Sequence, residues 1–384
     1  MSERVAFAPS EEHEALRDTV RRLAEQEIAP NAAGADEREE FPRASWDAWV
    51  RAGFAGLAFP EGVGGQAGGF LAHAIAVEEV ARVCASSALF TFIPKLAMTV
   101  VLDHGSPELI DRYVPRVASG ELHASYCLSE TNAGSDVAAM QTRAVRDGDR
   151  YVLNGSKHWI TGAGVSALYT VFAKTDPEAG HRGISVFVVE HDAPGASIGK
   201  LEHKMGMRGS PTGELMLDDC TVPAANLVGE EGRGFGYAMG ALDRSRPLVG
   251  AQALGIAQGA LELAVEYVKE RRQFGQRIAD FQGVQFMLAD LATQVDAARL
   301  LVYRACSLLD AGAGGTARAS STAKLVASDT AMRVTTDVVQ LLGGAGYTRD
   351  FPAERMMRDA KVTQIYEGTN QIQRVVIARQ LLGR

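Results

Sequence analysis

The sequence predicts an α+β fold, mostly helical, built from three consecutive domains. Three observations lead to this prediction. Apolar residues at helical spacing dominate residues 1–121, short β-prone runs dominate 122–231, and long helical runs return over 232–384. Because this order sets layers of different kinds against one another, we expect a cleft at a domain interface, where cofactors commonly bind.

The N-terminal domain is expected to be α-helical throughout. Ser10 and the acids after it are typical of a helix start, and Pro30 is expected to end that first helix. A second helix is expected from Ser45 to Ala52. After a glycine-rich loop at residues 60–65, further helices are expected around 75–83, 96–102 and 107–120.

The middle domain is expected to be a β domain of roughly a hundred residues, from 122 to 231. Asp147-Gly148 is a turn signal between two of its expected strands. The short β-prone runs are residues 123–128, 140–145, 151–153, 167–173, 184–189 and 215–217.

The C-terminal domain is expected to be a four-helix bundle. Long helical patterns cover about 235–271, 281–311 and 316–342, and a last one follows Gly368. The glycine cluster at 312–315 indicates a tight turn between two antiparallel helices, as in bundles with short loops.

Composition narrows the class of protein. The formal net charge of -8 over 384 residues disfavours a nucleic-acid surface, and we expect a small-molecule partner. The four cysteines are scattered without metal-ligand spacing, so we expect buried thiols and no metal site. The first residues lack a signal-peptide pattern, and we expect no membrane span; a cytoplasmic, soluble protein is the expectation.

One carboxylate near the C-terminus stands out as a candidate base. Glu367 lies between Tyr366, which can shield it from water, and Gly368, which lets a ligand approach the backbone. A partly desolvated carboxylate has a raised pKa and accepts protons better near neutral pH. The alternative is a plain helix N-terminus, in which Glu367 is a first-turn acid and Thr369 or Asn370 is the cap.

Two segments of the middle domain could hold a cofactor. Residues 126–136 run from a strand into a loop of small hydrogen-bonding residues, which suits a polar ring or a phosphate. Trp159 and Thr161 would present a flat wall and a donor on one face of a strand, as a flavin ring requires. An ordinary capped turn and a core tryptophan are the alternatives.

Polar residues in the bundle could bind phosphates. Arginines at 246 and 271 can pair with a pyrophosphate or a 3'-phosphate, and Gly343-Gly344 would allow close approach to the backbone. The alternative, which each arginine taken singly favours, is a solvated helix charge. The sequence has neither a P-loop nor a Rossmann glycine motif.

Together these motifs resemble the acyl-CoA dehydrogenase family, in order and across essentially the whole chain. The segments that carry the resemblance are residues 126–136, 159–161, 270–275, 340–344 and 365–369. The resemblance implies an N-terminal helical domain, a middle β-barrel and a C-terminal four-helix bundle. It also implies a homotetramer with one FAD per subunit and a role in fatty acid β-oxidation.

The resemblance also assigns residues. Ser129 replaces a threonine found in many members but keeps the hydroxyl, and Ser135 would also reach toward the CoA portion of the substrate. Those implied for FAD are Tyr126, Leu128, Ser129, Gly134, Ser135, Trp159, Ile160, Thr161, Arg271, Phe274, Gln282, Gln340, Gly343, Gly344, Thr369 and Gln371, with the ADP half held partly across a subunit interface. Those implied for the acyl-CoA substrate are Ser135, Asp243, Arg246 and Gly368.

Glu367 falls on the catalytic base position of most members. A minority place the base one residue before the arginine that matches Arg246, where this chain has Ser245, which cannot act as the base. The implied reaction is α,β-dehydrogenation of an acyl-CoA to a trans-2-enoyl-CoA. Flavin N5 would take the hydride beside Thr161, and the electrons would pass to an electron-transfer flavoprotein.

Other functions share parts of this pattern. An acyl-CoA oxidase would pass its electrons to oxygen, and the single-bundle length favours a dehydrogenase over it. A flavin-binding relative without turnover is disfavoured by the intact Glu367 and the acidic balance, and a nitroalkane oxidase would be expected to carry Asp as its base.

Overall fold

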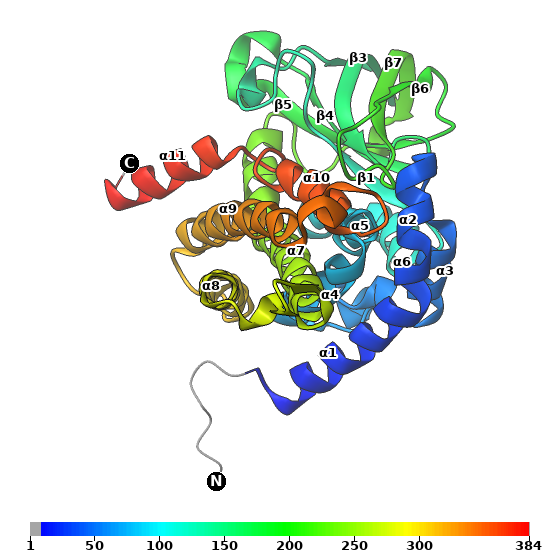
Figure 1. Ribbon diagram of the computed structural model, residues 1–384. Helices are drawn as coiled ribbons and strands as arrows, with labels where there is room; N and C mark the ends of the chain where they lie inside the picture. The colour runs from blue at the N-terminus through cyan, green and yellow to red at the C-terminus, as the bar shows by residue number, and fades with distance from the viewer. Residues whose placement is uncertain (1–8, 384) are drawn as a thin grey trace.

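The computed structural model describes residues 9–383, so the expectation drawn from the first five residues lies outside the described part. Within that part the chain runs from helices through a mixed sheet and back to helices, which confirms the predicted fold class. Figure 1 shows the sheet at the top of the molecule and the long helices α7, α8 and α9 below it, with α5 and α10 between the sheet and the lower helices.

The N-terminal domain holds six α-helices in the described residues. They are α1 (Glu11–Leu23), α2 (Ala29–Arg38), α3 (Arg43–Arg51), α4 (Gly69–Val83), α5 (Ala85–His104) and α6 (Pro107–Ala118). Ser10 caps α1 as predicted, because its side chain accepts from the backbone N–H of His13. The expectation that Pro30 ends the first helix is wrong. A π-helical turn, Ala24–Ile28, continues the chain into α2, and Pro30 lies in the first turn of α2, where a proline needs no N–H donor.

The middle domain is a seven-stranded mixed sheet in the order β1-β4-β2-β3-β7-β6, with β5 paired to β4. Its strands are β1 (Ala124–Cys127), β2 (Arg143–Asp147), β3 (Arg150–Thr161), β4 (Leu168–Lys174), β5 (Ile184–Glu190), β6 (Ala196–Leu201) and β7 (Thr212–Pro223). Strand β6 was not predicted, because its half-exposed residues lack a continuous apolar run. Among the described residues the pairings form a branched path and do not close a ring, so the expected barrel is a mixed sheet here.

The C-terminal domain is organised by α7 (Gly234–Glu270), a 37-residue helix. A short hairpin, β8 (Arg272–Gln273) with β9 (Gln276–Arg277), leads into α8 (Gln282–Asp310), and α9 (Thr316–Leu342) packs along α7. Two shorter helices follow, α10 (Ala353–Thr363) and α11 (Asn370–Leu381). The sequence predicted α11 but not α10; Figure 1 shows α11 extending away from the rest of the molecule.

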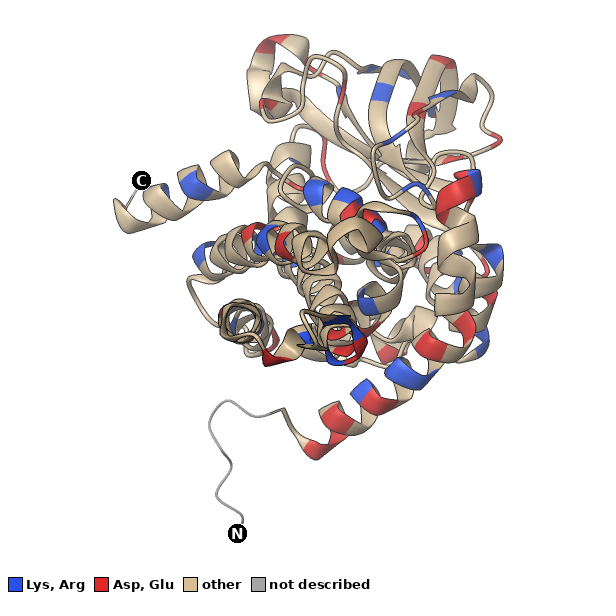
Figure 2. Ribbon diagram, in the orientation of Figure 1, with Lys and Arg blue, Asp and Glu red and all other residues tan. Residues whose placement is uncertain are grey.

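Two cores hold the fold together. One is shared by the helices and by residues of β1, β4 and β5, and the other lies within the middle domain. All four cysteines are buried free thiols, as expected. A buried pair of acids on α4, Glu78 and Glu79, accepts from arginines on α1 and α8, and Figure 2 shows basic and acidic residues interleaved along α1. These contacts fix α1 against the helices beside it.

Two helices, α5 and α7, are long and apolar enough to span a membrane by length and composition, although no such run was expected. Their apolar windows are 89% and 72% buried inside the protein. Burial of this kind is the ordinary situation of a core helix, so the two helices are weak evidence for a membrane span.

Candidate active site

Glu367 stands on a loop between α10 and α11 that turns sharply. Glu367 has φ 50 and Gly368 has φ 91, so two consecutive residues are left-handed. Thr369 caps α11 by accepting from the Ile372 N–H at 3.3 Å. Glu367 therefore precedes the cap and is not a first-turn acid of α11, which excludes the plain-helix alternative.

The Glu367 carboxylate is directed against α7. Ser245 Oγ donates to Glu367 Oε2, while Oε1 is buried and has no hydrogen-bond partner among the described residues. Burial raises the pKa of Glu367 to about 7, and the Ser245 hydroxyl, Arg246 and Lys324 only partly oppose that rise. A buried acid with one free oxygen and such a pKa is suited to accept a proton near neutral pH.

Tyr366, expected to shield the base, is tied to the core. Its hydroxyl donates to Gln252 Oε1, and Gln252 Nε2 donates to the Ala85 carbonyl at 2.9 Å. Burial raises the pKa of Tyr366 well above its usual range, and the neighbouring Glu367 charge adds to the rise. The phenol therefore stays neutral beside the carboxylate.

Arg246 and Asp243 lie together on α7 close to the base. Arg246 is 4% exposed; its Nη1 donates to Asp243 Oδ1, and its Nε is buried without a partner among the described residues. Burial raises the pKa of Asp243, and the Arg246 guanidinium opposes the rise. The pairing with Asp243 therefore leaves the Nε–H donor of the buried Arg246 guanidinium unused among the described residues.

The middle domain contributes Tyr126, Leu128 and Ser129 from β1 and the loop after it. The Tyr126 hydroxyl donates to the Ala238 carbonyl on α7 at 3.4 Å, which brings this strand to the side of the base. The Leu128 carbonyl accepts from the buried Lys157 at 3.2 Å, and the Ser129 carbonyl accepts from the His158 N–H at 2.9 Å. Further along the loop, Gly134 and Ser135 are exposed, and a Cβ added at Gly134 would meet no atom within 4 Å.

Trp159 is not a core residue. It has φ 63 at an irregularity in the β3–β7 pairing, and 57% of its surface is exposed. Ile160 next to it is buried, whereas Thr161 is half-buried and its carbonyl accepts from Ser125 Oγ at 2.5 Å. The irregularity turns the indole out of the sheet and leaves a flat aromatic face available to a ring-shaped ligand.

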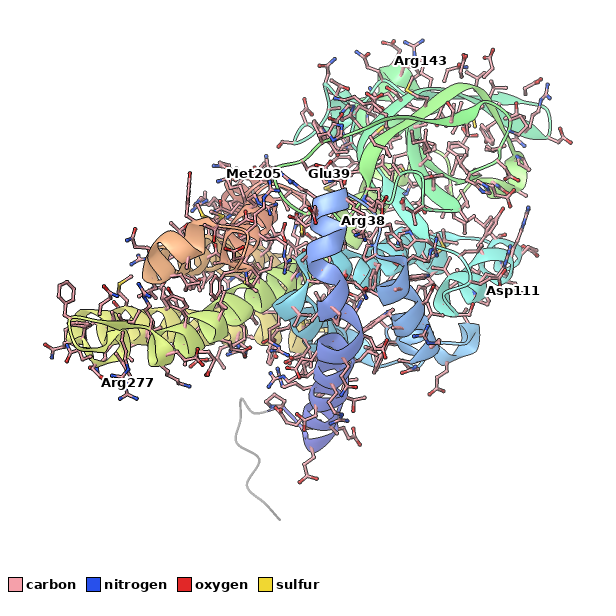
Figure 3. All side chains as sticks on the ribbon, turned by 45° about the vertical axis from the view of Figure 1, so that its right-hand side comes forward. Arg38, Glu39, Asp111, Arg143, Met205 and Arg277 are labelled. Carbon is pink, nitrogen blue, oxygen red and sulfur yellow. The ribbon has the colours of Figure 1, made fainter. Side chains whose placement is uncertain are left out.

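A second group of predicted residues lies at the other end of the bundle. At 1.5 Å per residue, α7 carries Arg271 about 39 Å away from Ser245. Figure 3 shows Arg277, in the hairpin that follows Arg271, at the tip of the bundle, far from the sheet around Arg143. The group consists of Arg271, Phe274, Gln282, Gln340, Gly343 and Gly344, most of them exposed. Gln371 is exposed on α11.

The two groups offer two separate surfaces to a ligand. The sheet offers the exposed Trp159 face and the open backbone at Gly134, and the bundle tip offers Phe274, which is 93% exposed, and Gly343-Gly344, where an added Cβ would meet nothing within 4 Å. The distance along α7 means that one chain does not bring the two groups together.

Four residues near these groups were not singled out from the sequence for the roles they have. Ser245 was considered only as a base, yet it donates to the base. Gln252, Lys157 and Lys324 are fully buried polar side chains. Lys324 had a readable signal, because it falls on the apolar and small-residue stripe of a strongly periodic helix, where a lysine is costly unless it is bound.

The chain is similar to known proteins over nearly its whole length. The sequence matches the models for the acyl-CoA dehydrogenase N-terminal domain over residues 10–121, middle domain over 125–220 and C-terminal domain over 232–382. It is 53% identical over 376 residues, 98% of this chain and 97% of the relative, to the probable acyl-CoA dehydrogenase fadE25 of Mycobacterium leprae (strain TN).

Two solved structures are similar over nearly the whole chain. Butyryl-CoA dehydrogenase from Megasphaera elsdenii has a TM-score of 0.95 at 40% identity, covering 98% of this chain and 100% of that one. A chain from the structure described as "Electron transferring flavoprotein of Acidaminococcus fermentans: Towards a mechanism of flavin-based electron bifurcation" has a TM-score of 0.96 at 45% identity, covering 99% of this chain and 100% of that chain.

Proposed function

The chain belongs to the acyl-CoA dehydrogenase family, and from that premise we propose that it removes a hydrogen from each of the α and β carbons of an acyl-CoA, with Glu367 as the base. It is an oxidoreductase, and its cofactor is FAD, as in the rest of this family. One observation supports the assignment of the base above all others: Glu367 has a buried, unpartnered carboxylate oxygen and a pKa raised to about 7.

The proton of the α carbon passes to Glu367. A pKa of about 7 in place of the usual 4.5 makes the carboxylate a stronger base by about 3 kcal/mol, at 1.36 kcal/mol per unit. The Ser245 hydroxyl occupies one oxygen and leaves the other free to receive the proton. The product expected is a trans-2-enoyl-CoA.

A carboxylate of this strength still needs help, because the α proton of a thioester is only weakly acidic. The Glu367 backbone N–H donates to no described residue and is the chain's candidate donor to the thioester oxygen. One well-placed donor to a developing oxyanion contributes about 3 to 4 kcal/mol. When bound, FAD supplies the acceptor for the hydride that leaves the β carbon.

The residues predicted for FAD and CoA remain assignments within this proposal. Tyr126, Leu128, Ser129, Trp159, Ile160 and Thr161 would hold the ring end of FAD, with Gly134, Ser135, Thr369 and Gln371 beside it. Asp243, Arg246, Ser135 and Gly368 would meet the acyl-CoA. The unused Nε of the buried Arg246 supports a polar ligand at this point.

The far group of FAD residues requires a second copy of the chain. Arg271, Phe274, Gln282, Gln340, Gly343 and Gly344 would bind the ADP half of an FAD whose ring end rests on another subunit. The separation of about 39 Å along α7 and the exposure of Phe274 support this arrangement. A homotetramer is the assembly proposed.

Electrons would leave through an electron-transfer flavoprotein, and the similarity to a chain from a solved structure of such a system supports that acceptor. The test is anaerobic titration of the FAD-loaded protein with a panel of acyl-CoAs, followed by flavin absorbance. Bleaching by at least one acyl-CoA is expected, and failure of every acyl-CoA would contradict the proposal. Slow reoxidation in air together with rapid reoxidation by an electron-transfer flavoprotein would exclude an oxidase.

A further inference from the structure

Lys324 is a buried lysine whose position no ion pair explains. It lies in the middle of α9, fully buried, among small side chains that include Ser321, Ala323 and Ser328. A buried ammonium group is costly unless it is hydrogen-bonded or paired. The other fully buried lysine, Lys157, pairs with Glu130 at 2.7 Å, whereas Lys324 makes no salt bridge within the described part of the chain.

The oxygens that hold Lys324 belong to the loop that carries Glu367. Lys324 Nζ donates to the Gly368 carbonyl at 2.9 Å and to Asn370 Oδ1 at 2.8 Å. We propose that Lys324 is a positioning residue for the base, and that its ammonium group fixes the turn on which Glu367 is presented to the substrate. This proposal rests on the proposed function.

The turn needs such a contact because its backbone is unfavourable. The left-handed conformation is unfavourable for a residue other than glycine, and Glu367 has φ 50. The turn directs the Glu367 and Gly368 carbonyls inward, where Gln373 Nε2 lies 3.3 Å and 2.8 Å from them. Lys324 and Gln373 thus approach the Gly368 carbonyl together and stabilise the conformation.

Helix α9 also holds both ends of the loop. At the start of the loop, Gln364 Nε2 donates to Oδ1 of Asp329 on α9, at 2.6 Å. At the end of the loop, Asn370 Nδ2 donates to the same Asp329 oxygen at 2.8 Å and to Ser328 Oγ at 2.9 Å. Lys324 lies one turn before these residues on α9, so a single helix fixes the beginning, the centre and the end of the loop.

The positive charge of Lys324 also acts on the Glu367 carboxylate. Burial lowers the pKa of Lys324 to about 7, while the Glu367 carboxylate and Asp329 raise it and Arg246 lowers it further. In return, the ammonium favours the ionised form of Glu367. The other groups facing that carboxylate are Ser245 and Arg246 on α7, Tyr126 on β1 and the neighbouring Tyr366.

The test replaces Lys324 by Met, which keeps the length and removes the charge and the donors. In the FAD-loaded protein, Lys324→Met is expected to lower kcat about 100-fold with KM near wild type, because a small misplacement of a reacting group costs that much. The acid limb of the pH profile of kcat should move to higher pH, because the cation that favours ionised Glu367 is gone. The surface variant Lys269→Met is the matched control and should change neither kcat nor the acid limb of its pH profile.

A second measurement does not depend on turnover. Hydrogen exchange of the segment 364–370 in the free protein should become faster in Lys324→Met and stay unchanged in Lys269→Met. If Lys324→Met does not fold, Asn370→Ala removes one of the two oxygens instead, and a kcat about tenfold lower at unchanged KM is expected.

Two results would overturn the proposal. One is a Lys324→Met enzyme with kcat within threefold of wild type. The other is a variant whose stability falls while its acid limb and the exchange of 364–370 stay as in wild type. A wild-type protein that no acyl-CoA reduces would instead refute the proposed function, so the two failures are distinguishable.

Discussion

The base loop and the tip of the bundle differ in how completely one chain specifies them. At the base loop, Glu367 is held by Ser245 on α7, and Gly368 by Lys324 on α9. At the bundle tip, Phe274 is 93% exposed, and the backbone at Gly343 and Gly344 faces open space. The first region is preorganised within the chain, whereas the second is largely exposed among the described residues, where Phe274 meets only the edge of Phe281 among aromatic rings.

The difference separates the region that would carry out the chemistry from the region that would hold the cofactor and contact a second subunit. The raised pKa of Glu367 comes from burial, and the residues that contact its carboxylate belong to the same chain. A long cofactor can be held by residues from two chains, because its ends need not touch the same subunit. Changes at the base loop should therefore affect chemistry, and changes at the tip should affect cofactor retention and assembly.

The largest expected effect is loss of turnover in Glu367→Gln. The amide cannot accept the proton, so turnover should fall by about 10⁴-fold, at the upper end for a general base. Flavin absorbance and acyl-CoA binding should be unchanged. Glu266→Gln, at an exposed position of α7, is the control. Turnover within tenfold of wild type would exclude Glu367 as the base.

The same substitution should stabilise the protein at alkaline pH. Because the pKa of Glu367 is raised from 4.5 to about 7, the folded state holds a proton that the unfolded state loses between these values. Stability contributed by that proton is present below pH 4.5 and is lost as the pH rises through about 7. Urea unfolding of Glu367→Gln should give a free energy up to about 3 kcal/mol above wild type at pH 8.

That gain should be much smaller at pH 5, where folded wild-type Glu367 is protonated, and it should vanish below about pH 4.5, where the unfolded chain is protonated as well. A gain of equal size at all of these pH values would mean that the burial of the carboxylate charge is not its source.

At the bundle tip, Phe274→Asp should weaken FAD retention. Placing a charge where an aromatic contact to FAD or to a second copy is proposed should raise the Kd for FAD about tenfold, or about 1.4 kcal/mol. Equilibrium dialysis and size-exclusion chromatography would measure retention and assembly. Val145→Asp, at another exposed apolar residue, is the control. Equal FAD affinity in Phe274→Asp and wild type would mean that the bundle tip does not contribute to the FAD site.

The smallest expected effect is the pH dependence of flavin reduction. With the pKa of Glu367 at about 7, the rate should rise with pH and reach a plateau above it, and it should be about tenfold below the plateau at pH 6. Stopped-flow reduction by an acyl-CoA measures this. The acid limb of this pH profile should be unchanged in Phe274→Asp reloaded with FAD. A shifted acid limb would mean that the base loop and the bundle tip are coupled.

The sequence was sufficient for the fold class, because the fold class depends on local pattern. It also singled out Glu367, through the family resemblance, and the role of Glu367 as the base stays a proposal. Helical spacing predicted α9 at the bounds that the structure has, and the residues around Glu367 predicted a shielded acid. Where tertiary packing overrides local signals, prediction failed. Pro30 was expected to end a helix, yet it lies in the first turn of α2 after a π turn. Helix α10 was not predicted, although its sequence is amphipathic.

The environment of the base could not be read from the sequence. Ser245 and Lys324 lie 122 and about 43 residues from Glu367, and only the packing of α7 and α9 brings them to it. The exposure of Trp159 depends on a pairing irregularity that a strand pattern does not reveal. The assignments of the remaining FAD and CoA residues stay predictions.

The irregularity at Trp159 gives the protein a built-in optical reporter. Of the three indoles in the chain, those of Trp46 and Trp49 are buried in the N-terminal core, and only Trp159 has a largely solvated ring. Emission from the first two should be blue and insensitive to small molecules, while the third should be red-shifted and quenched when a flat ring covers it. Fluorescence alone would then distinguish empty from loaded protein.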